Sequence, residues 1–186
     1  MSHTTELKII TEATHGVKLA LAYATEDNFT GKLIYKNAVC ALHPDAEECL
    51  KKAVAHAKRA GYTIIIYDAF RPAKAQQRLW EFLPDDNYVT PPEKGSAHTR
   101  GVAIDLGLID NRTGEVVDMG TGFDDMSELS HTDCPDLPTE VIRNRAILLG
   151  IMLHAGFSEI KYEWWHYQLP RAFDYPLLDN DLIEVV

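Results

Sequence analysis

The clearest regular feature of the chain is a set of apolar residues repeated at helical spacing. From Pro44 to Ala60 they fall on one helix face, with proline in the first turn and Gly61 suited to a left-handed cap. The same spacing predicts a second long helix from Glu140 to His154, ending at Gly156. A shorter helix is expected over Ala73–Phe82. The pattern thus predicts three helices.

Strand patterns lie between these helices. The β-branched run Thr63–Tyr67 predicts a buried strand. Positions alternate over Gly101–Leu108, where one face is apolar and the other carries only glycine, alanine and Asp105. Glu115–Asp118 is expected to return as the second strand of a hairpin. The last strand is predicted over Lys161–Leu169.

The remaining segments indicate loops rather than a second domain. Residues 83–95 are rich in proline, and residues 120–138 are irregular and rich in aspartate. The chain has no internal repeat and no low-complexity linker, and its helices and strands do not alternate regularly. At 186 residues, the sequence predicts one domain spanning residues 1–186.

Composition and charge narrow the functional class. The net charge is −10 at pH 7 without any basic cluster, which disfavours nucleic acids and anionic membranes as partners. No apolar run approaches the ~20 residues needed to span a bilayer, and the polar start Met1–Glu6 does not resemble a secretory signal. Cys40, Cys49 and Cys134 are odd in number and scattered, which favours reduced thiols and a cytoplasmic location.

Two of the eight histidines are candidates for metal ligands. His98 lies seven positions before Asp105, and His166 follows two tryptophans. Imidazole nitrogens and a carboxylate oxygen are zinc ligands, and a site with three protein ligands keeps one position for water, as catalytic zinc sites do. Such spacing also arises by chance, so the pattern alone is a weak indication.

Two charged residues could serve such a site. Zinc lowers the pKa of its bound water to about 7, and Glu163 is the candidate base beside that water. Positions three apart on a strand point to opposite faces. Glu163 and His166 can therefore share a site only if Glu163 lies at the strand entry, in a bulge or on a helical turn. Arg71, at a strand-to-helix corner, could stabilise an oxyanion or could simply pair with Asp68.

Taken together, these residues resemble a known family. Ser96–Asp105 fits the pattern Ser-x-His-x-x-Gly-x-Ala-x-Asp. With Glu163–His166 it is similar to the zinc D-alanyl-D-alanine dipeptidases, the VanX-like branch of the D,D-peptidases. Three further segments resemble markers of that family: Tyr23–Lys32, Asp68–Pro72 and Gly122–Met126. The five segments follow the family's order and span most of the chain.

The resemblance implies an enzyme with one zinc ion per chain. The zinc ligands would be His98, Asp105 and His166. Glu163 would be the general base that activates the metal-bound water and later passes a proton to the leaving amine, while Arg71 would stabilise the tetrahedral intermediate. The implied fold is α+β, with a central antiparallel sheet flanked by helices, of the hedgehog and D,D-peptidase type.

The implied substrate is the free dipeptide D-alanyl-D-alanine, hydrolysed to two D-alanines. Asp124 and Tyr23 would hold its ammonium group, Ser96 would help to hold its carboxylate, and Tyr35 would line the same pocket. A zwitterion needs an anion at one end and donors at the other, which Asp124 and Ser96 can supply. Asp124 belongs to an acidic cluster, however, and could equally be a solvated loop residue.

Two other functions stay open from the sequence. A D,D-carboxypeptidase or peptidoglycan endopeptidase would use the same zinc and base on a substrate with a blocked amine, for which an ammonium anchor has no use. A hedgehog-like domain would carry the zinc as a non-catalytic binding module, and Glu163 together with Arg71 argues against it. The residues fix neither the stereochemistry of the substrate nor the biological role, whether glycopeptide resistance, recycling of wall fragments or nutrition. The oligomeric state also stays open, a homodimer being one option.

Overall fold

Five strands form a sheet at the centre of the protein, and two long helices cover one of its faces. The structure is a computed structural model that describes residues 6–186. In sheet order, the strands are β2 (Lys18–Leu19), β4 (Tyr62–Asp68), β5 (Ala103–Asp110), β7 (His166–Gln168) and β6 (Ser158–Glu159). Neighbouring strands are antiparallel except for β2 and β4, which are parallel. The α+β class is confirmed, and the β2–β4 pair makes the sheet mixed.

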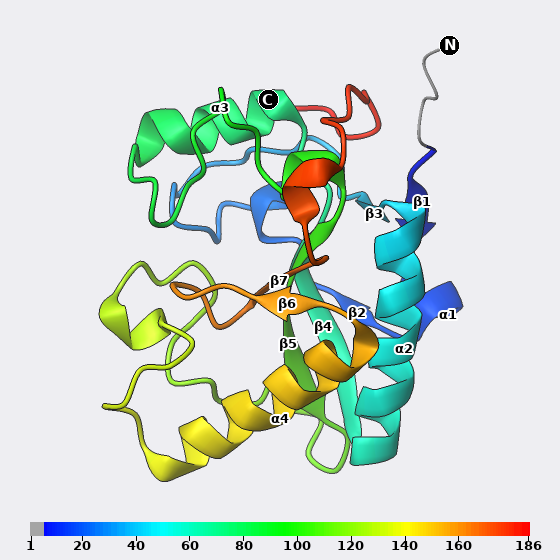
Figure 1. The fold of residues 1–186 in the computed structure, drawn as a ribbon, viewed down its shortest axis with the longest axis vertical. Helices are drawn as coiled ribbons and strands as arrows, with labels where there is room; N and C mark the ends of the chain where they lie inside the picture. Colours follow the sequence, from blue (N-terminus) through cyan, green and yellow to red (C-terminus); the bar gives the residue numbers. More distant parts are fainter. Residues whose placement is uncertain (1–5) are drawn as a thin grey trace.

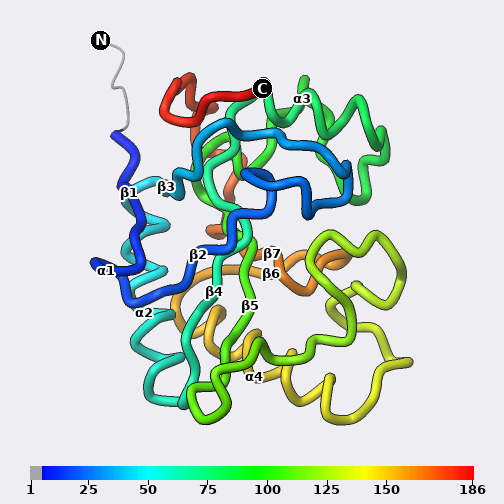
Figure 2. The backbone as a smooth tube through the Cα atoms, turned by 180° about the vertical axis from the view of Figure 1, so that it is seen from behind, coloured from blue at the N-terminus to red at the C-terminus, as the bar shows by residue number. Residues whose placement is uncertain are grey.

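The two long helices, α2 (Pro44–Ala60) and α4 (Thr139–Ala155), lie against each other on the same side of the sheet. Figure 1 shows α4 in front of the strands, and Figure 2, from behind, shows β4 and β5 in front of both helices. Ile104, Leu106 and Leu108 of β5 join the main hydrophobic core with residues of α2 and α4. Because side chains alternate along a strand, Asp105 points to the opposite face.

A second core lies beneath α3 (Ala73–Phe82), at the end of the molecule far from α4 (Figure 1). It contains Tyr23, Tyr35, Phe70 and Leu79. A small antiparallel sheet of β1 (Lys8–Ile10) and β3 (Cys40–Leu42) and the short helix α1 (Glu12–His15) complete the N-terminal part. Single 3-10 turns occur at Ala22–Ala24, His98–Arg100, Glu128–Ser130 and Ala172–Asp174.

The predicted helices agree closely with the structure. The bounds of α2 and α3 match the prediction, and α4 is one residue longer at each end. Strand β4 also extends one residue beyond each end of the predicted Thr63–Tyr67. The predicted strand Gly101–Leu108 begins two residues later, since Gly101 adopts a left-handed conformation that caps the preceding turn. Residues 120–138 are irregular as expected, apart from one 3-10 turn.

Two strand predictions were wrong. The strand predicted over Lys161–Leu169 is confined to β7, because the Trp164 N–H donates to the Ser130 carbonyl outside the sheet and the His166 N–H donates to the Glu163 carbonyl, closing a turn. The predicted return strand Glu115–Asp118 is reduced to one bridge between Ile109 and Val116, after which the chain leaves the sheet.

Among residues 6–186, no helix has the length and apolar character that crossing a bilayer requires.

Gly101 is expected to be essential to the junction between the His98 turn and β5. Its φ is +70°, and a Cβ there would lie 2.9 Å from Leu7 Cδ2 and 3.2 Å from the His43 backbone nitrogen. Gly101→Ala should cost about 1–2 kcal/mol for the left-handed backbone and about 1–3 kcal/mol more for overpacking. Gly114→Ala is the matched control, because Gly114 has φ +76° with open space around it. Urea denaturation should show the larger loss for Gly101→Ala, and equal losses would contradict the packing argument.

Candidate active site

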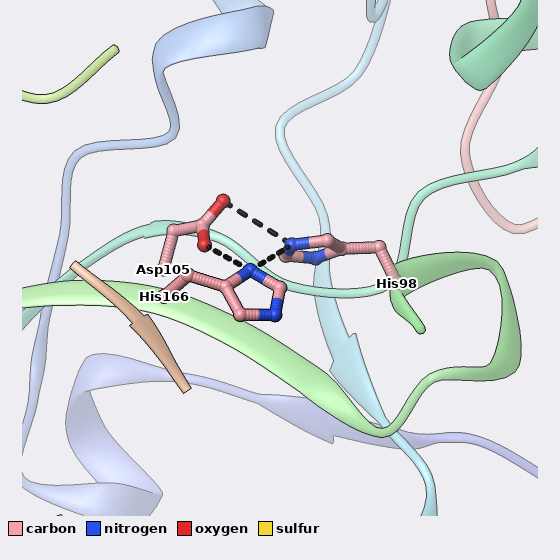
Figure 3. A group of neighbouring side chains, drawn as sticks. All are labelled: His98, Asp105 and His166. Atoms are coloured by element: carbon pink, nitrogen blue, oxygen red, sulfur yellow. Dashed lines mark hydrogen bonds and ion pairs between the residues drawn. The ribbon is translucent and has the colours of Figure 1, made fainter. Parts of the chain in front are cut away.

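Three side chains converge on one point beside the β5–β7 strand pair (Figure 3). His98 lies on a 3-10 turn, Asp105 on β5, and His166 at the start of β7, where it is the register partner of Asp105. His166 Nδ1 lies 3.1 Å from both His98 Nε2 and Asp105 Oδ1. His98 Nε2 lies 3.3 Å from Asp105 Oδ2, and all three side chains are buried. The structure thus brings the three predicted ligands together.

Hydrogen bonds on the far side of each imidazole determine which nitrogen faces this point. His98 Nδ1 donates to the Ala69 carbonyl at 2.7 Å, because a carbonyl can only accept. His166 Nε2 donates to Gln168 Oε1 at 3.0 Å for the same reason. In the neutral rings, the inner nitrogens then direct lone pairs toward each other and toward Asp105. Three acceptors within 4.8 Å repel unless a cation lies among them, so this donor set fits a divalent metal.

Glu163 lies three residues before β7, and its carbonyl accepts from the His166 N–H to close a turn. This turn, rather than a continuous strand, lets the two side chains share a site. Its Oε2 is 3.8 Å from His166 Nδ1, and its side chain is buried. Burial raises the pKa of Glu163 to about 8, with His166 opposing the rise and the Asp105 charge adding to it. Burial also acts to raise the pKa of Asp105, but the facing imidazoles outweigh it and hold that pKa below its ordinary value. The two carboxylates therefore suit different roles, a proton acceptor and a permanent anion.

Arg71 follows β4 and is held rigidly near the three ligands. Its Nε donates to Asp68 Oδ2 at 2.9 Å, and its Nη1 donates to Gln76 Oε1 at 3.0 Å. Its Nη2 lies 2.9 Å from the same Asp68 oxygen and 3.6 Å from Asp105 Oδ2. The pairing with Asp68 therefore exists, and it fixes the guanidinium at the edge of the site where it can still donate to a ligand.

Asp124 and Tyr23 meet at the cavity that the three ligands also line. Tyr23 OH donates to Asp124 Oδ1 at 3.2 Å, and the Tyr23 ring lies under the Arg71 guanidinium, 5.2 Å from its Cζ. Asp124 Oδ2 is buried and has no hydrogen-bond partner within residues 6–186. Burial raises the pKa of Asp124 well above its ordinary value, and the Asp105 charge adds to the rise. Asp124 is thus half-buried, with an enclosed Oδ2 that has no partner among residues 6–186, and it is not a solvated loop acid.

The predicted site residues line one cavity of about 230 Å³, with the exception of Tyr35. This is below the ~300–1,000 Å³ typical for drug-sized ligands, so the cavity suits a small molecule. Ser96 lines it, and its Oγ accepts from the His98 N–H at 3.1 Å, leaving the hydroxyl hydrogen able to donate. Tyr35 is buried elsewhere in the second core, and its hydroxyl donates to Asp68 Oδ1 at 3.0 Å. Tyr35 therefore supports the residue that holds Arg71.

The sequence reasoning missed two glutamines that orient the site. Gln168 fixes the His166 ring, and its position two residues along the same strand was the signal that could have identified it. Gln76 holds Arg71 and also donates to the Thr90 carbonyl at 2.7 Å. Its signal was a polar residue on the otherwise apolar, buried face of α3.

Comparison with known proteins assigns the family. Residues 3–185 match the M15 peptidase family described as D-ala-D-ala dipeptidase. The chain is 47% identical over 178 residues to the D-alanyl-D-alanine dipeptidase of Escherichia coli K12, covering 96% of this chain and 92% of that protein. It is 36% identical to the enzyme of that name from Enterococcus faecalis (85% and 88% coverage) and 31% identical to that from Streptomyces coelicolor (94% and 99%). The chain belongs to the M15 D-Ala-D-Ala dipeptidase family, which is a family of hydrolases.

Gln168 is expected to tune metal binding without touching the metal. Gln168→Met removes the acceptor for His166 Nε2–H, so the ring is free to rotate and to change tautomer. Loss of such an outer partner typically weakens metal affinity about 10–100-fold. Chelator competition with Zn²⁺ measures the change, with Gln77→Met on the exposed face of α3 as control. Equal affinity of Gln168→Met and wild type would contradict this role.

The metal-free protein is expected to lose stability as pH rises through the range in which Glu163 titrates. Between the ordinary pKa of 4.5 and about 8, the folded protein keeps a proton on Glu163 that the unfolded chain has released. Stability from this proton is present below pH 4.5 and is lost toward pH 8. Glu163→Gln should remove up to about 1.4 kcal/mol per pH unit of this slope. Urea denaturation of both chelated proteins from pH 5 to pH 8 tests this, and parallel curves would refute it.

Proposed function

We propose that this chain forms one zinc-dependent dipeptidase domain that hydrolyses free D-alanyl-D-alanine to two D-alanines. The observation that carries the proposal is the composition of one small cavity. It combines three convergent metal donors with a buried Asp124 oxygen that has no partner in the described part of the chain. The names of the relatives support D-alanyl-D-alanine as the particular substrate.

One zinc ion is proposed as the cofactor, held by His98, Asp105 and His166. Two imidazole nitrogens and a carboxylate oxygen are the donor set of catalytic zinc sites with one open position. When bound, zinc would lower the pKa of a water molecule and polarise the peptide carbonyl.

Glu163 is proposed as the general base. Its side chain is buried with Oε2 3.8 Å from His166 Nδ1, where a carboxylate beside the metal can accept a proton from the attacking water and then deliver it to the leaving amine. Arg71 is proposed to stabilise the oxyanion of the tetrahedral intermediate. The contacts with Asp68 and Gln76 support this role, because a guanidinium fixed before the reaction costs no reorganisation during it.

The two charged ends of the substrate would be bound by different groups. Asp124 would take the ammonium group as the missing partner of its buried Oδ2, with Tyr23 holding the other oxygen. Ser96 would donate its hydroxyl to the substrate carboxylate. A site of this kind is specific for a free dipeptide, since both charges of the zwitterion are used.

The alternatives differ in their need for these groups. A D,D-carboxypeptidase or endopeptidase would take a substrate with a blocked amine and would leave Asp124 buried without a partner, at an energetic cost. A zinc-binding module without catalysis would not need a buried base together with a fixed guanidinium.

A cytoplasmic location is proposed from the three free cysteines, which suit a reducing compartment.

The substrate preference should be sharp. With Zn²⁺ bound, the protein is expected to release D-alanine from D-alanyl-D-alanine. N-acetyl-D-alanyl-D-alanine should have a kcat/KM lower by at least about 100-fold, because acetylation removes the charge that Asp124 needs and leaves this carboxylate unpaired. A ninhydrin assay coupled to metal analysis measures both. Equal turnover of the two substrates would favour the carboxypeptidase function.

Glu163→Gln separates catalysis from binding in the same assay. The variant should keep one zinc per chain and lose about 10²–10⁴-fold in kcat, as expected for a lost general base. If the wild type hydrolyses no small peptide, the binding-module function replaces the enzyme.

Asp124→Asn should weaken use of the free dipeptide. Asparagine tolerates the left-handed backbone of this position (φ 60°), so the change isolates the charge. A charge-assisted hydrogen bond contributes about 1.5–3 kcal/mol, which corresponds to a kcat/KM about 10–100-fold lower, mostly through KM. Steady-state kinetics at fixed zinc occupancy tests this, and unchanged kinetics would exclude the ammonium anchor.

A further inference from the structure

The residue proposed to bind the substrate ammonium lies on a segment with little regular structure. Residues 119–131, here called the anchor loop, contain only the 3-10 turn Glu128–Ser130. Asp124 nevertheless adopts a left-handed backbone with φ 60° and a buried side chain oxygen. Such a backbone persists only where its surroundings hold it.

Arg145 binds the anchor loop near both of its ends. It projects from the middle of α4 and is buried. Its Nε donates to the carbonyl of Met119, its Nη1 to that of His131 and its Nη2 to that of Leu129, each at 2.8 Å. Asp124 lies between these attachment points. One rigid guanidinium therefore closes the anchor loop from within.

Trp164 makes a second set of contacts with the same loop. Its ring lies under Arg145, 5.8 Å from the guanidinium carbon. Its Nε1 donates to Thr121 Oγ1 at 2.8 Å, and its backbone N–H donates to the Ser130 carbonyl at 3.0 Å. The hydroxyls of Thr121 and Ser130 are themselves 3.1 Å apart. Trp164 also directly follows Glu163, so the loop is tied to the chain segment that carries the proposed base.

Arg145 is a buried cation whose hydrogen bonds all serve to hold backbone atoms of the anchor loop. Its three acceptors are neutral carbonyl oxygens, so no acidic side chain among these acceptors balances its charge. Burying a charge is unfavourable, and charge-assisted hydrogen bonds offset that cost only when their geometry is good. The arrangement gives the anchor loop one defined conformation relative to Glu163.

We propose that Arg145 and Trp164 are positioning residues for substrate binding. They hold the anchor loop so that the Asp124 carboxylate stands at the distance from Glu163 that a dipeptide requires. The inference rests on the proposed role of Asp124 as the ammonium anchor. Neither residue lies at the reacting atoms, so their effect on the reaction passes through Asp124.

A double-mutant cycle tests this coupling. Arg145→Met removes the three donors and keeps much of the side-chain volume. It should raise KM for D-alanyl-D-alanine by up to about 100-fold, the cost of a misplaced contact, while kcat and zinc content change much less. In the Asp124→Asn background, Arg145→Met should add little further loss, because the anchor is already absent. Arg143→Met, an exposed position on the same helix, is the control and should leave the kinetics unchanged.

Three outcomes are distinguishable. Losses that multiply in the double variant, or a fall in kcat with unchanged KM, would show that Arg145 acts independently of Asp124 and would overturn the inference. If Asp124→Asn alone leaves KM unchanged, the ammonium anchor itself is wrong, and the proposed function fails with it. If Asp124→Asn raises KM and Arg145→Met does not, only the positioning role fails.

Trp164→Phe keeps the test decisive if Arg145→Met does not fold. Phenylalanine preserves an aromatic ring beside Arg145 but loses the Nε1 hydrogen bond to Thr121. We expect a KM several-fold higher, the equivalent of one hydrogen bond of about 1 kcal/mol, with kcat and the melting temperature close to wild type. A KM equal to that of wild type, in a folded and zinc-loaded variant, would contradict the proposal.

Discussion

The pairing of β5 with β7 is the constraint on which the candidate site depends. It sets Asp105 opposite His166 in register, so two of the three donors are brought together by backbone hydrogen bonds rather than by a metal. Their geometry is maintained from below by the core that β5 shares with α2 and α4. The third donor, His98, is fixed by the turn that Gly101 caps and by the Ala69 carbonyl. The three donor side chains are therefore held in place by the fold. Such preorganisation matters because imidazole and carboxylate donors bind several divalent metals, and the geometry of the site selects among them.

Charge balance connects this geometry to function. Asp105, Asp124 and Glu163 line one cavity, and among the described residues that line it Arg71 supplies the one guanidinium, which pairs with the adjacent Asp68. Burial makes so many acids costly unless protons or cations compensate. A divalent ion beside Asp105 and an ammonium group beside Asp124 would supply that compensation at two separate points. The positions of these acids thus favour ligands that carry positive charge at the same two points.

The sequence predicted the parts of this molecule that depend on local rules. The bounds of α2 follow from proline in its first turn, a glycine cap and apolar periodicity, and those of α3 from the preceding Pro72 and apolar periodicity. The candidate site residues were named from motifs that resemble a family, since their spacing alone is a weak indication. Two short elements were missed: β2 exists only through its pairing with the distant β4, and the four residues of α1 are too few to show a periodic pattern. Contacts between segments also explain why three supporting residues were missed, namely Gln168, Gln76 and Arg145. The contact of Tyr35 with Asp68 was missed for the same reason.

The contact between Tyr23 and Asp124 joins residues 101 positions apart, and that between His98 and His166 spans 68. Closing such long loops carries an entropic cost before any contact compensates for it. The cavity walls should therefore be completed late on the folding pathway, after α2, α4 and the central strands have formed. A nascent chain that has not yet reached residue 163 would lack the proposed base and one of the proposed metal ligands. The proposed activity would thus appear only once the segments from Tyr23 to His166 have reached their native topology.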